Sequence, residues 1–381
     1  MPAVLALLVS FAVSVVVTLL LVHSAHAHAH RSGDRDFSKP QKFHAVAVPR
    51  IGGAGVVLGL LAAAAAVALD QGAAAGTFAL TLLACASPAF VAGFLQDFTE
   101  AVPPRGRLAA TCVSAALAFF VLDAQIRHTA IPGLDWLVGF TLGALLLTVF
   151  AVAGIANAIN IIDGFNGLAS MCVILMLAAV AYVAFQVGDT LVATLALAGI
   201  GATFGFFLWN FPSGLIFLGD GGAYFLGFFV AELSILLLVR NPQVSPIFPL
   251  LVCIYPVFET VFSIYRRWVL RARPAHMPDG IHLHSLVYRR VMRWAVPDRN
   301  ARELTMRNSR TSPVLWALCM ASIIPAVLFW DMTTMLSLTL LLFAASYVVL
   351  YWRIVRFRAP RLLRALGTRP APLHAGDNRE T

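Results

Sequence analysis

Long apolar runs separated by short polar segments make up most of this chain. Most of the runs come close to the roughly 20 residues that a helix needs to cross the hydrocarbon core of a bilayer. We therefore predict an all-α fold, a polytopic transmembrane helical bundle of about 11 spans. The predicted spans cover residues 3–22, 51–69, 77–95, 108–122, 134–155, 167–187, 190–208, 221–239, 247–264, 313–330 and 334–352.

The composition agrees with this pattern, since 60% of the residues are hydrophobic and only 12% are charged. Soluble globular domains do not have this balance. Residues 1–352 are expected to form one transmembrane catalytic domain with a large cytoplasmic loop at 265–312. A basic cytoplasmic tail follows at 353–381. No Lys or Arg precedes the first apolar run, so we interpret that run as a retained anchor and not as a cleaved signal peptide.

Basic residues are distributed very unevenly between the connecting segments. If the spans alternate in direction, 25 of the 27 Lys and Arg residues fall on one side of the membrane, and only Arg127 and Arg240 fall on the other. Because Lys and Arg are enriched in cytoplasmic loops, we expect the N-terminus to be external and the C-terminus cytoplasmic. Topology and attraction to anionic membrane lipids then explain the net charge of +9, and no nucleic-acid partner is expected.

Five short polar motifs fall on the same predicted cytoplasmic face, although they are far apart in the sequence. One shared face indicates one active site. The motifs are Arg50-Ile51-Gly52-Gly53, Phe94-Leu95-Gln96-Asp97, Asn157-Ala158-Ile159-Asn160-Ile161-Ile162-Asp163-Gly164, Phe217-Leu218-Gly219-Asp220-Gly221-Gly222 and Asp279-Gly280-Ile281-His282-Leu283-His284.

Two of these motifs concentrate carboxylates and amides beside glycines. Asp220 lies between glycines directly before a predicted helix, where a carboxylate can hold a divalent cation or simply cap the helix. Asn157, Asn160 and Asp163 are spaced three residues apart, so a helix would place their side chains on one face. Such polar groups at the end of a span indicate a site, although a polar turn between two spans is the alternative.

Other polar residues have simpler alternatives. Asp97 could be an ordinary solvated acid at the membrane interface. His282 and His284 could bind a diphosphate or nucleotide, because histidine is not needed for topology, whereas the nearby arginines fit ordinary positive-inside charge. Glu232 lies in the middle of a predicted span, where it is either functional or protonated within the bundle. Glu259 precedes Arg266 at a spacing that suits an ion pair along one helix.

Together, and in this order along the chain, the five motifs resemble those of the polyprenyl-phosphate N-acetylhexosamine-1-phosphate transferases. The resemblance implies transfer of N-acetylhexosamine-1-phosphate from a UDP-sugar to undecaprenyl phosphate, which gives a lipid-diphosphate-sugar and UMP and starts a cell-envelope polysaccharide. It implies Mg2+ as cofactor, or Mn2+ in its place, and a multi-pass protein of the bacterial inner membrane whose site faces the cytoplasm. A homodimer is left open.

The resemblance also implies roles for residues at matching positions. The catalytic residues would be Asp97 and Asp163, the metal ligands Asp220 and Asn160, and the substrate-binding residues His282, His284, Asn157, Arg50 and Lys42. The chain departs from the family pattern at Gln96, where a second aspartate is usual, and at Ser285, where a third histidine often follows. Gln96 cannot act as a base or a nucleophile, so we expect direct attack by the lipid phosphate.

A transporter or flippase for a lipid-linked or anionic substrate is the alternative from another functional class. It would account for the polytopic bundle and for Glu232. Such proteins, however, place their functional polar groups near the midplane and often show paired repeats. The acidic motifs here lie at the predicted cytoplasmic ends of spans, which favours an enzyme at the membrane interface.

Overall fold

In a computed structural model, the protein is described for residues 2–24, 48–270, 281–295 and 300–356. This part of the chain is helical without a β-strand, which confirms the all-α prediction. Nine helices in it are long and apolar enough to cross a membrane. They are α1 (Pro2–His23), α3 (Gly53–Gln71), α4 (Ala73–Thr99), α7 (Thr141–Ile162), α8 (Leu168–Gln186), α9 (Thr190–Asn210), α10 (Gly219–Arg240), α15 (Ala301–Leu328) and α16 (Thr333–Val355).

The remaining helices are shorter or less apolar. They are α5 (Pro104–Val121), α6 (Pro132–Val138), α11 (Ile247–Val252), α12 (Ile254–Tyr265), α13 (Leu283–Leu286) and α14 (Met292–Ala295), with single π-helical turns η1 (Arg266–Leu270) and η2 (Val287–Val291). The fourth predicted span, 108–122, corresponds to α5. This helix begins at Pro104, carries Arg105 and Arg107 in its first turn and is not among the nine, so the predicted count of eleven spans is not confirmed in the described part.

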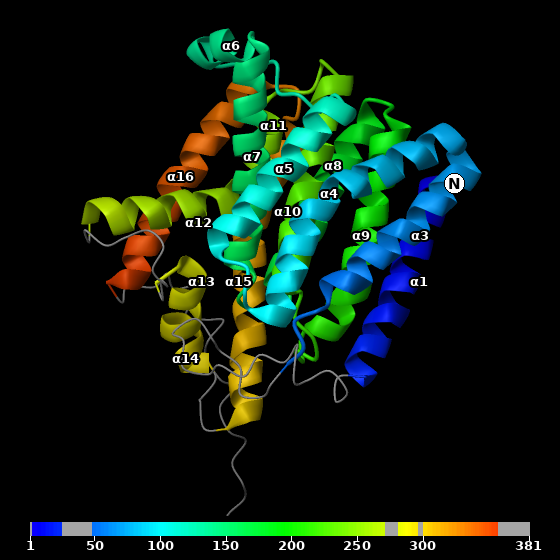
Figure 1. Cartoon of the computed structure of the whole chain (residues 1–381). Helices are drawn as coiled ribbons and strands as arrows, with labels where there is room; N and C mark the ends of the chain where they lie inside the picture. Colours follow the sequence, from blue (N-terminus) through cyan, green and yellow to red (C-terminus); the bar gives the residue numbers. More distant parts are fainter. Residues whose placement is uncertain (1, 25–47, 271–280, 296–299, 357–381) are drawn as a thin grey trace, which may run out of the picture.

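Two other predicted spans differ from the structure. The span predicted at 134–155 is replaced by α6 and the displaced helix α7, because the chain leaves the helix at Gly139 and Phe140. The span predicted at 247–264 is broken between α11 and α12, and Figure 1 shows α12 lying across the direction of the neighbouring helices. Pro256 accounts for the break, since its ring excludes the helical hydrogen bond to the carbonyl of Val252, the last residue of α11.

Helix α10 forms the centre of the bundle. It contacts α3, α4, α5, α7, α8 and α9, and nearly all of its side chains from Gly219 to Leu237 are buried. Small residues let neighbouring helices approach closely, as is common where lipid removes the hydrophobic drive for helix association. A Cβ added to Gly227 of α10 would lie 2.5 Å from the Cα of Ala156 in α7. One added to Gly201 of α9 would lie 2.3 Å from the carbonyl oxygen of Leu7 in α1.

The outward faces of the peripheral helices are apolar. Leu20 of α1 is 60% exposed and Leu341 of α16 is 67% exposed, and neither lies beside a charged residue in the sequence. Such surfaces suit contact with lipid chains. Figure 1 shows that α6 lies at one end of the bundle, whereas α13, α14 and the start of α15 lie at the other.

Candidate active site

The motif-bearing ends of α3, α4, α7 and α10 meet at the end of the bundle opposite α6 (Figure 1). The segment before α3 pairs through its backbone with the segment before α10. Phe217 donates its N–H to the carbonyl of Pro49 at 2.8 Å, and Gly52 and Gly53 donate to the carbonyls of Phe217 and Leu218, each at 2.9 Å. This pairing joins two of the five predicted motifs into one rigid frame.

Glycines allow the elements of this frame to touch backbone to backbone. Gly219 has φ +78°, a left-handed conformation that favours glycine. A Cβ on it would lie 1.9 Å from the carbonyl oxygen of Arg50 and 2.5 Å from Oδ2 of Asp97. A Cβ on Gly93 of α4 would lie 2.5 Å from the backbone nitrogen of Gly221. Any side chain at Gly219 or Gly93 would therefore push the two halves of the site apart.

Asp97 of α4 holds the first turn of α10 by its backbone. Its Oδ1 accepts a hydrogen bond from the N–H of Asp220 at 2.9 Å, and its Oδ2 accepts one from the N–H of Gly221 at 3.0 Å. The residue is only 5% exposed, so the solvated interfacial acid that the sequence left open is not what the structure shows. Because both carboxylate oxygens are committed to backbone donors, Asp97 has the geometry of a positioning residue.

The carboxylate of Asp220 lies among cationic and amide groups. It forms an ion pair with Arg107 of α5, accepts a hydrogen bond from Nδ2 of Asn160 at 2.9 Å, and lies 3.7 Å from Nη2 of Arg50. Arg50 also lies 3.9 Å from Oδ1 of Asp97. The structure thus brings Asp97, Asn160, Asp220 and Arg50 together, as predicted for a shared site.

Arg107 is a component of this site that sequence reasoning missed. Its side chain is 12% exposed, and its guanidinium also lies 5.9 Å from the centre of the Tyr224 ring. Tyr224 in turn contacts Asn157, with its hydroxyl 3.3 Å from Oδ1 of that residue. In the sequence, Arg107 is one of two arginines, with Arg105, between predicted spans, and these were used only to assign the cytoplasmic side of the membrane.

Asp163 lies at the C-terminal end of α7, one helical turn beyond Asn160. Its low access to solvent raises the pKa of its carboxyl to about 7, while the positive charge of Arg50 acts in the opposite direction. A carboxyl with this pKa exists in both protonation states near neutral pH.

Asn166, in the same polar motif, has a structural role. Its backbone N–H donates to Oδ1 of Asn308 at 2.8 Å, and its side-chain amide donates to the carbonyl of Pro212 and to Oγ of Ser309, each at 3.1 Å. Asn308 and Ser309 belong to α15. The loop after α7 is therefore tied to the last third of the chain, which places the Asn-rich motif in a fixed position.

The histidine motif packs against this same loop. The ring of His284 lies 5.5 Å from that of Phe165 and stacks on His282 at 5.0 Å with an angle of 11°. Glu259 of α12 accepts hydrogen bonds from Nδ1 of His282 at 3.0 Å and from the hydroxyl of Tyr347 at 2.6 Å. Glu259 is thus linked to other elements of the fold, and its position beside His282 was not anticipated from the sequence.

Other residues singled out in the sequence lie away from Asp220 or outside the described residues. Gln96 uses its side-chain oxygen to accept the backbone N–H of Val102 at 2.8 Å, so it closes the turn after α4. Lys42 and the motif residue Asp279 lie outside the described residues. Glu232 is fully buried in α10, and neither of its carboxylate oxygens has a hydrogen-bond partner among the described residues.

The donor set at Asp220 fits a hard divalent cation that substrate helps to bind. No group of three His, Cys, Asp or Glu residues in the described ranges is arranged to hold a metal ion by itself. Mg2+, however, is commonly held by one or two carboxylates together with substrate phosphates. Asp220 supplies one carboxylate, with Asn160 beside it as a neutral oxygen ligand. A metal ion bound there would either share the Asp220 carboxylate with Arg107 or displace the Arg107 guanidinium from it.

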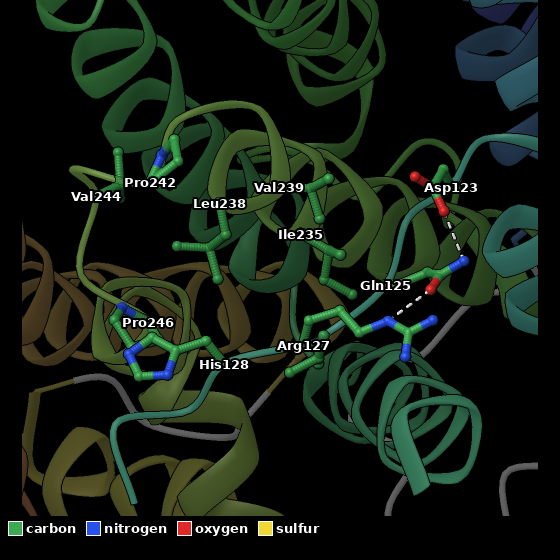
Figure 2. Close-up of a pocket in the computed structure, with 11 residues that line it drawn as sticks. Asp123, Gln125, Arg127, His128, Ile235, Leu238, Val239, Pro242, Val244 and Pro246 are labelled. Atoms are coloured by element: carbon green, nitrogen blue, oxygen red, sulfur yellow. Dashed lines mark hydrogen bonds between the residues drawn. The ribbon is translucent and has the colours of Figure 1, made fainter. Parts of the chain in front are cut away.

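A hollow of about 450 Å3 at the opposite end of the bundle is separate from the residues around Asp220. Figure 2 shows apolar side chains of α10, among them Ile235, on one wall and a polar chain on the other. In that chain Gln125 donates to Asp123 at 2.6 Å, and Arg127 donates to Gln125 at 2.8 Å. None of the predicted site residues lines this hollow, so it is not the candidate active site.

Residues 79–238 match the sequence model of glycosyl transferase family 4. The chain is 31% identical over 283 residues to the probable undecaprenyl-phosphate N-acetylglucosaminyl 1-phosphate transferase of Bacillus subtilis (strain 168), a match that covers 73% of this chain and 76% of that protein. It is 35% identical over 159 residues to a phospho-N-acetylmuramoyl-pentapeptide-transferase of Streptococcus thermophilus (strain CNRZ 1066), over 39% of this chain and 46% of the relative. The corresponding transferase of Geobacillus thermodenitrificans (strain NG80-2) is 29% identical over 245 residues, with 61% and 74% covered.

Proposed function

This chain belongs to glycosyl transferase family 4, and we propose that it transfers N-acetylhexosamine-1-phosphate from a UDP-sugar to undecaprenyl phosphate. The products would be a lipid-diphosphate-sugar and UMP, at the start of a cell-envelope polysaccharide. One observation carries the proposal: Asp220 is held by Asp97 and set between Arg50, Arg107 and Asn160 at the end of the bundle. We place this end on the cytoplasmic side of the bacterial inner membrane, where UDP-sugars are available, on the basis of the charge distribution.

The proposed reaction is a direct in-line displacement. An oxygen of the lipid phosphate attacks the donor phosphorus that carries the sugar, and the bond from that phosphorus to the bridging oxygen of UMP breaks. Two of the four negative charges stay on the lipid product and two leave on UMP. No enzyme nucleophile takes part, which agrees with glutamine at position 96. Catalysis then depends on positioning and on stabilisation of charge.

Electrostatic repulsion between the two substrates is the main obstacle to this reaction. The second pKa of a phosphate monoester is near 6, so the acceptor is largely a dianion at neutral pH. Arg50 and Arg107 lie at Asp220, where each can turn a guanidinium toward phosphate oxygens. When bound at Asp220 and Asn160, Mg2+ or Mn2+ would neutralise the donor diphosphate and the developing charge on UMP.

Asp163 is proposed to accept the proton that remains on a monoanionic acceptor. Its pKa of about 7 is close to that of the phosphate, which favours proton transfer near neutral pH. Asp97 would keep Asp220 and Gly221 in position, as its two hydrogen bonds indicate. The role of Asp97 in the reaction is thus proposed to be indirect.

The donor is proposed to lie between the Asn-rich motif and the histidine loop. His282 and His284 would contact its diphosphate, with Asn157 nearby on α7 and Lys42 assigned to one of the phosphates. Packing of His284 on Phe165 supports this arrangement, because it joins the histidine loop to the loop that follows Asp163. The transporter alternative gains no support from Glu232, because this residue is fully buried in α10.

Release of UMP by the purified protein tests the proposal. Protein in detergent is incubated with undecaprenyl phosphate, Mg2+ and a panel of UDP-N-acetylhexosamines. We expect UMP and a lipid-diphosphate-sugar in equal amounts, and loss of both by orders of magnitude in Asp220→Asn. Asp123→Asn, at the opposite end of the bundle, is the matched control and should retain activity. If no nucleotide sugar yields UMP in the presence of the lipid phosphate, the proposed reaction is wrong.

A further inference from the structure

A second hollow, of about 500 Å3, lies beside the candidate site, between the loop after α9 and the first half of α15. Phe211, Pro212 and Ser213 form its loop side. The α15 side includes Arg302 and Arg310, with Met306 between them. None of the residues proposed for transfer lines this hollow, so it needs a separate explanation.

The two arginines are placed to bind one anion. Arg302, Met306 and Arg310 are spaced four residues apart, so they lie along one face of α15 within about 12 Å. Both arginines are exposed, and neither forms an ion pair with a described residue. Their charge is therefore not neutralised by the described part of the protein.

The hollow lies where α15 passes from a polar to an apolar sequence. The part of α15 before Pro313 carries four charged residues, whereas the residues after Pro313 are almost wholly apolar. The ring of Trp316 packs against Phe211 at 5.0 Å, just beyond the arginines. Tryptophan is enriched at the boundary between lipid chains and headgroups. The arginines thus lie at headgroup level, and the apolar side chains lie on the hydrocarbon side.

We propose that this hollow binds a phospholipid with an anionic headgroup, drawn from the leaflet that surrounds this end of the bundle. Its phosphate would lie between Arg302 and Arg310, and the start of its acyl chains would contact Met306, Phe211 and Pro313. Charge complementarity selects the headgroup, and the apolar wall selects a lipid over a soluble phosphate. This site is separate from the proposed transfer reaction and does not depend on it.

A lipid bound in the hollow would also stabilise the loop that follows Asp163 in the candidate active site. Ser309 lines the hollow, donates a hydrogen bond to the carbonyl of Pro212 and accepts one from the side chain of Asn166. Asn166 belongs to the loop that follows Asp163. A bound lipid would therefore hold together the loop and the helix that fix this motif.

Lipid binding can be measured without reference to activity. Full-length protein in detergent is mixed with phosphatidylglycerol or phosphatidylcholine, and retained lipid is counted by native mass spectrometry. We expect tight retention of phosphatidylglycerol, with affinity lowered about 30-fold in Arg302→Gln/Arg310→Gln, as expected for two arginines near an anionic headgroup. The control is Arg293→Gln/Arg353→Gln, which removes the same charge from two other exposed arginines.

Several outcomes would overturn the inference. Equal losses in the two double variants would show only a general effect of charge, and equal retention of phosphatidylcholine would remove the role of the headgroup. Displacement of the lipid by millimolar glycerol phosphate would indicate a soluble ligand instead. Should the double variant fail to fold, each single variant is expected to show about a fivefold loss, and no loss in either would contradict the site. Failure of UMP release leaves these measurements unaffected, so the two proposals fail separately.

Discussion

Arg107 forms an ion pair with Asp220 across 113 positions of the sequence. The pair joins the start of α5 to the start of α10 and leaves only 12% of the arginine side chain exposed. The negative charge most central to the proposed site is therefore balanced by a residue from outside the five motifs.

Arg107→Gln should lower kcat/KM by about tenfold to 100-fold, because a charge-assisted contact to Asp220 and to phosphate is lost. The exposed neighbour Arg105 provides a matched control, since Arg105→Gln removes the same charge without that contact. Arg107→Lys should recover part of the activity. Steady-state kinetics of the three variants decides the point, and equal effects in Arg105→Gln and Arg107→Gln would contradict it.

Asp163 predicts a pH dependence of the transfer rate. Its raised pKa means that the carboxyl is neutral below about pH 7 and becomes a base only above it. Activity should therefore fall as the pH drops through 7, with a second fall near pH 6 as the acceptor phosphate takes up its proton. In Asp163→Asn the rate should be lower and the limb at pH 7 should disappear. A pH–rate profile that keeps this limb in the variant would rule out Asp163 as its source.

Removing the hydroxyl of Tyr347 in α16 is expected to affect donor binding. Its hydroxyl donates to Glu259, which in turn accepts from Nδ1 of His282, so loss of this hydroxyl should loosen the histidine. Tyr347→Phe should raise the donor KM about threefold to tenfold with little change in the KM for the lipid. Tyr255→Phe is the control, because the Tyr255 hydroxyl is buried without a hydrogen-bond partner among the described residues. A comparable change in that control would show a packing effect instead.

Asp189, between α8 and α9, predicts a pH-dependent contribution to stability. Burial alone would raise the pKa of its carboxyl, but hydrogen bonds from Arg240 and Asn241 outweigh burial and hold the pKa below its ordinary value. The ionised form therefore stabilises the folded protein above the unfolded pKa near 4, and this contribution is lost as the pH falls through the folded pKa. Asp189→Asn should lower Tm by about 2–5 °C at pH 7. The difference from the native protein should persist down to about pH 4 and shrink below it, as the folded carboxylate takes up its proton, and a constant difference would contradict the ionic explanation.

The sequence was sufficient for features that depend on local pattern. Apolar runs predicted most of the long helices, and the motifs at Asp97, Asn160 and Asp220 proved to share one end of the bundle. The break before Ile254 was not predicted, because the high average hydropathy of residues 247–264 hides the local effect of Pro256 on helix geometry.

Features that depend on distant contacts were not accessible in this way. The partnership of Arg107 with Asp220 joins residues from separate helices, and the role of Asn166 requires side chains from α15. Amino-acid type alone could not separate Asn166, which fixes a loop, from Asn160, which faces a carboxylate. Three-dimensional packing assigns their roles.

Asp97 fixes the backbone at the start of α10 independently of the side chain at position 220. Its carboxylate binds the N–H groups of Asp220 and Gly221, and every amino acid except proline offers such a group. The identity of residue 220 can therefore change while its location does not. A change of side chain at position 220 would therefore alter the chemistry of the site without moving its backbone, whereas a change at position 97 would release the backbone itself.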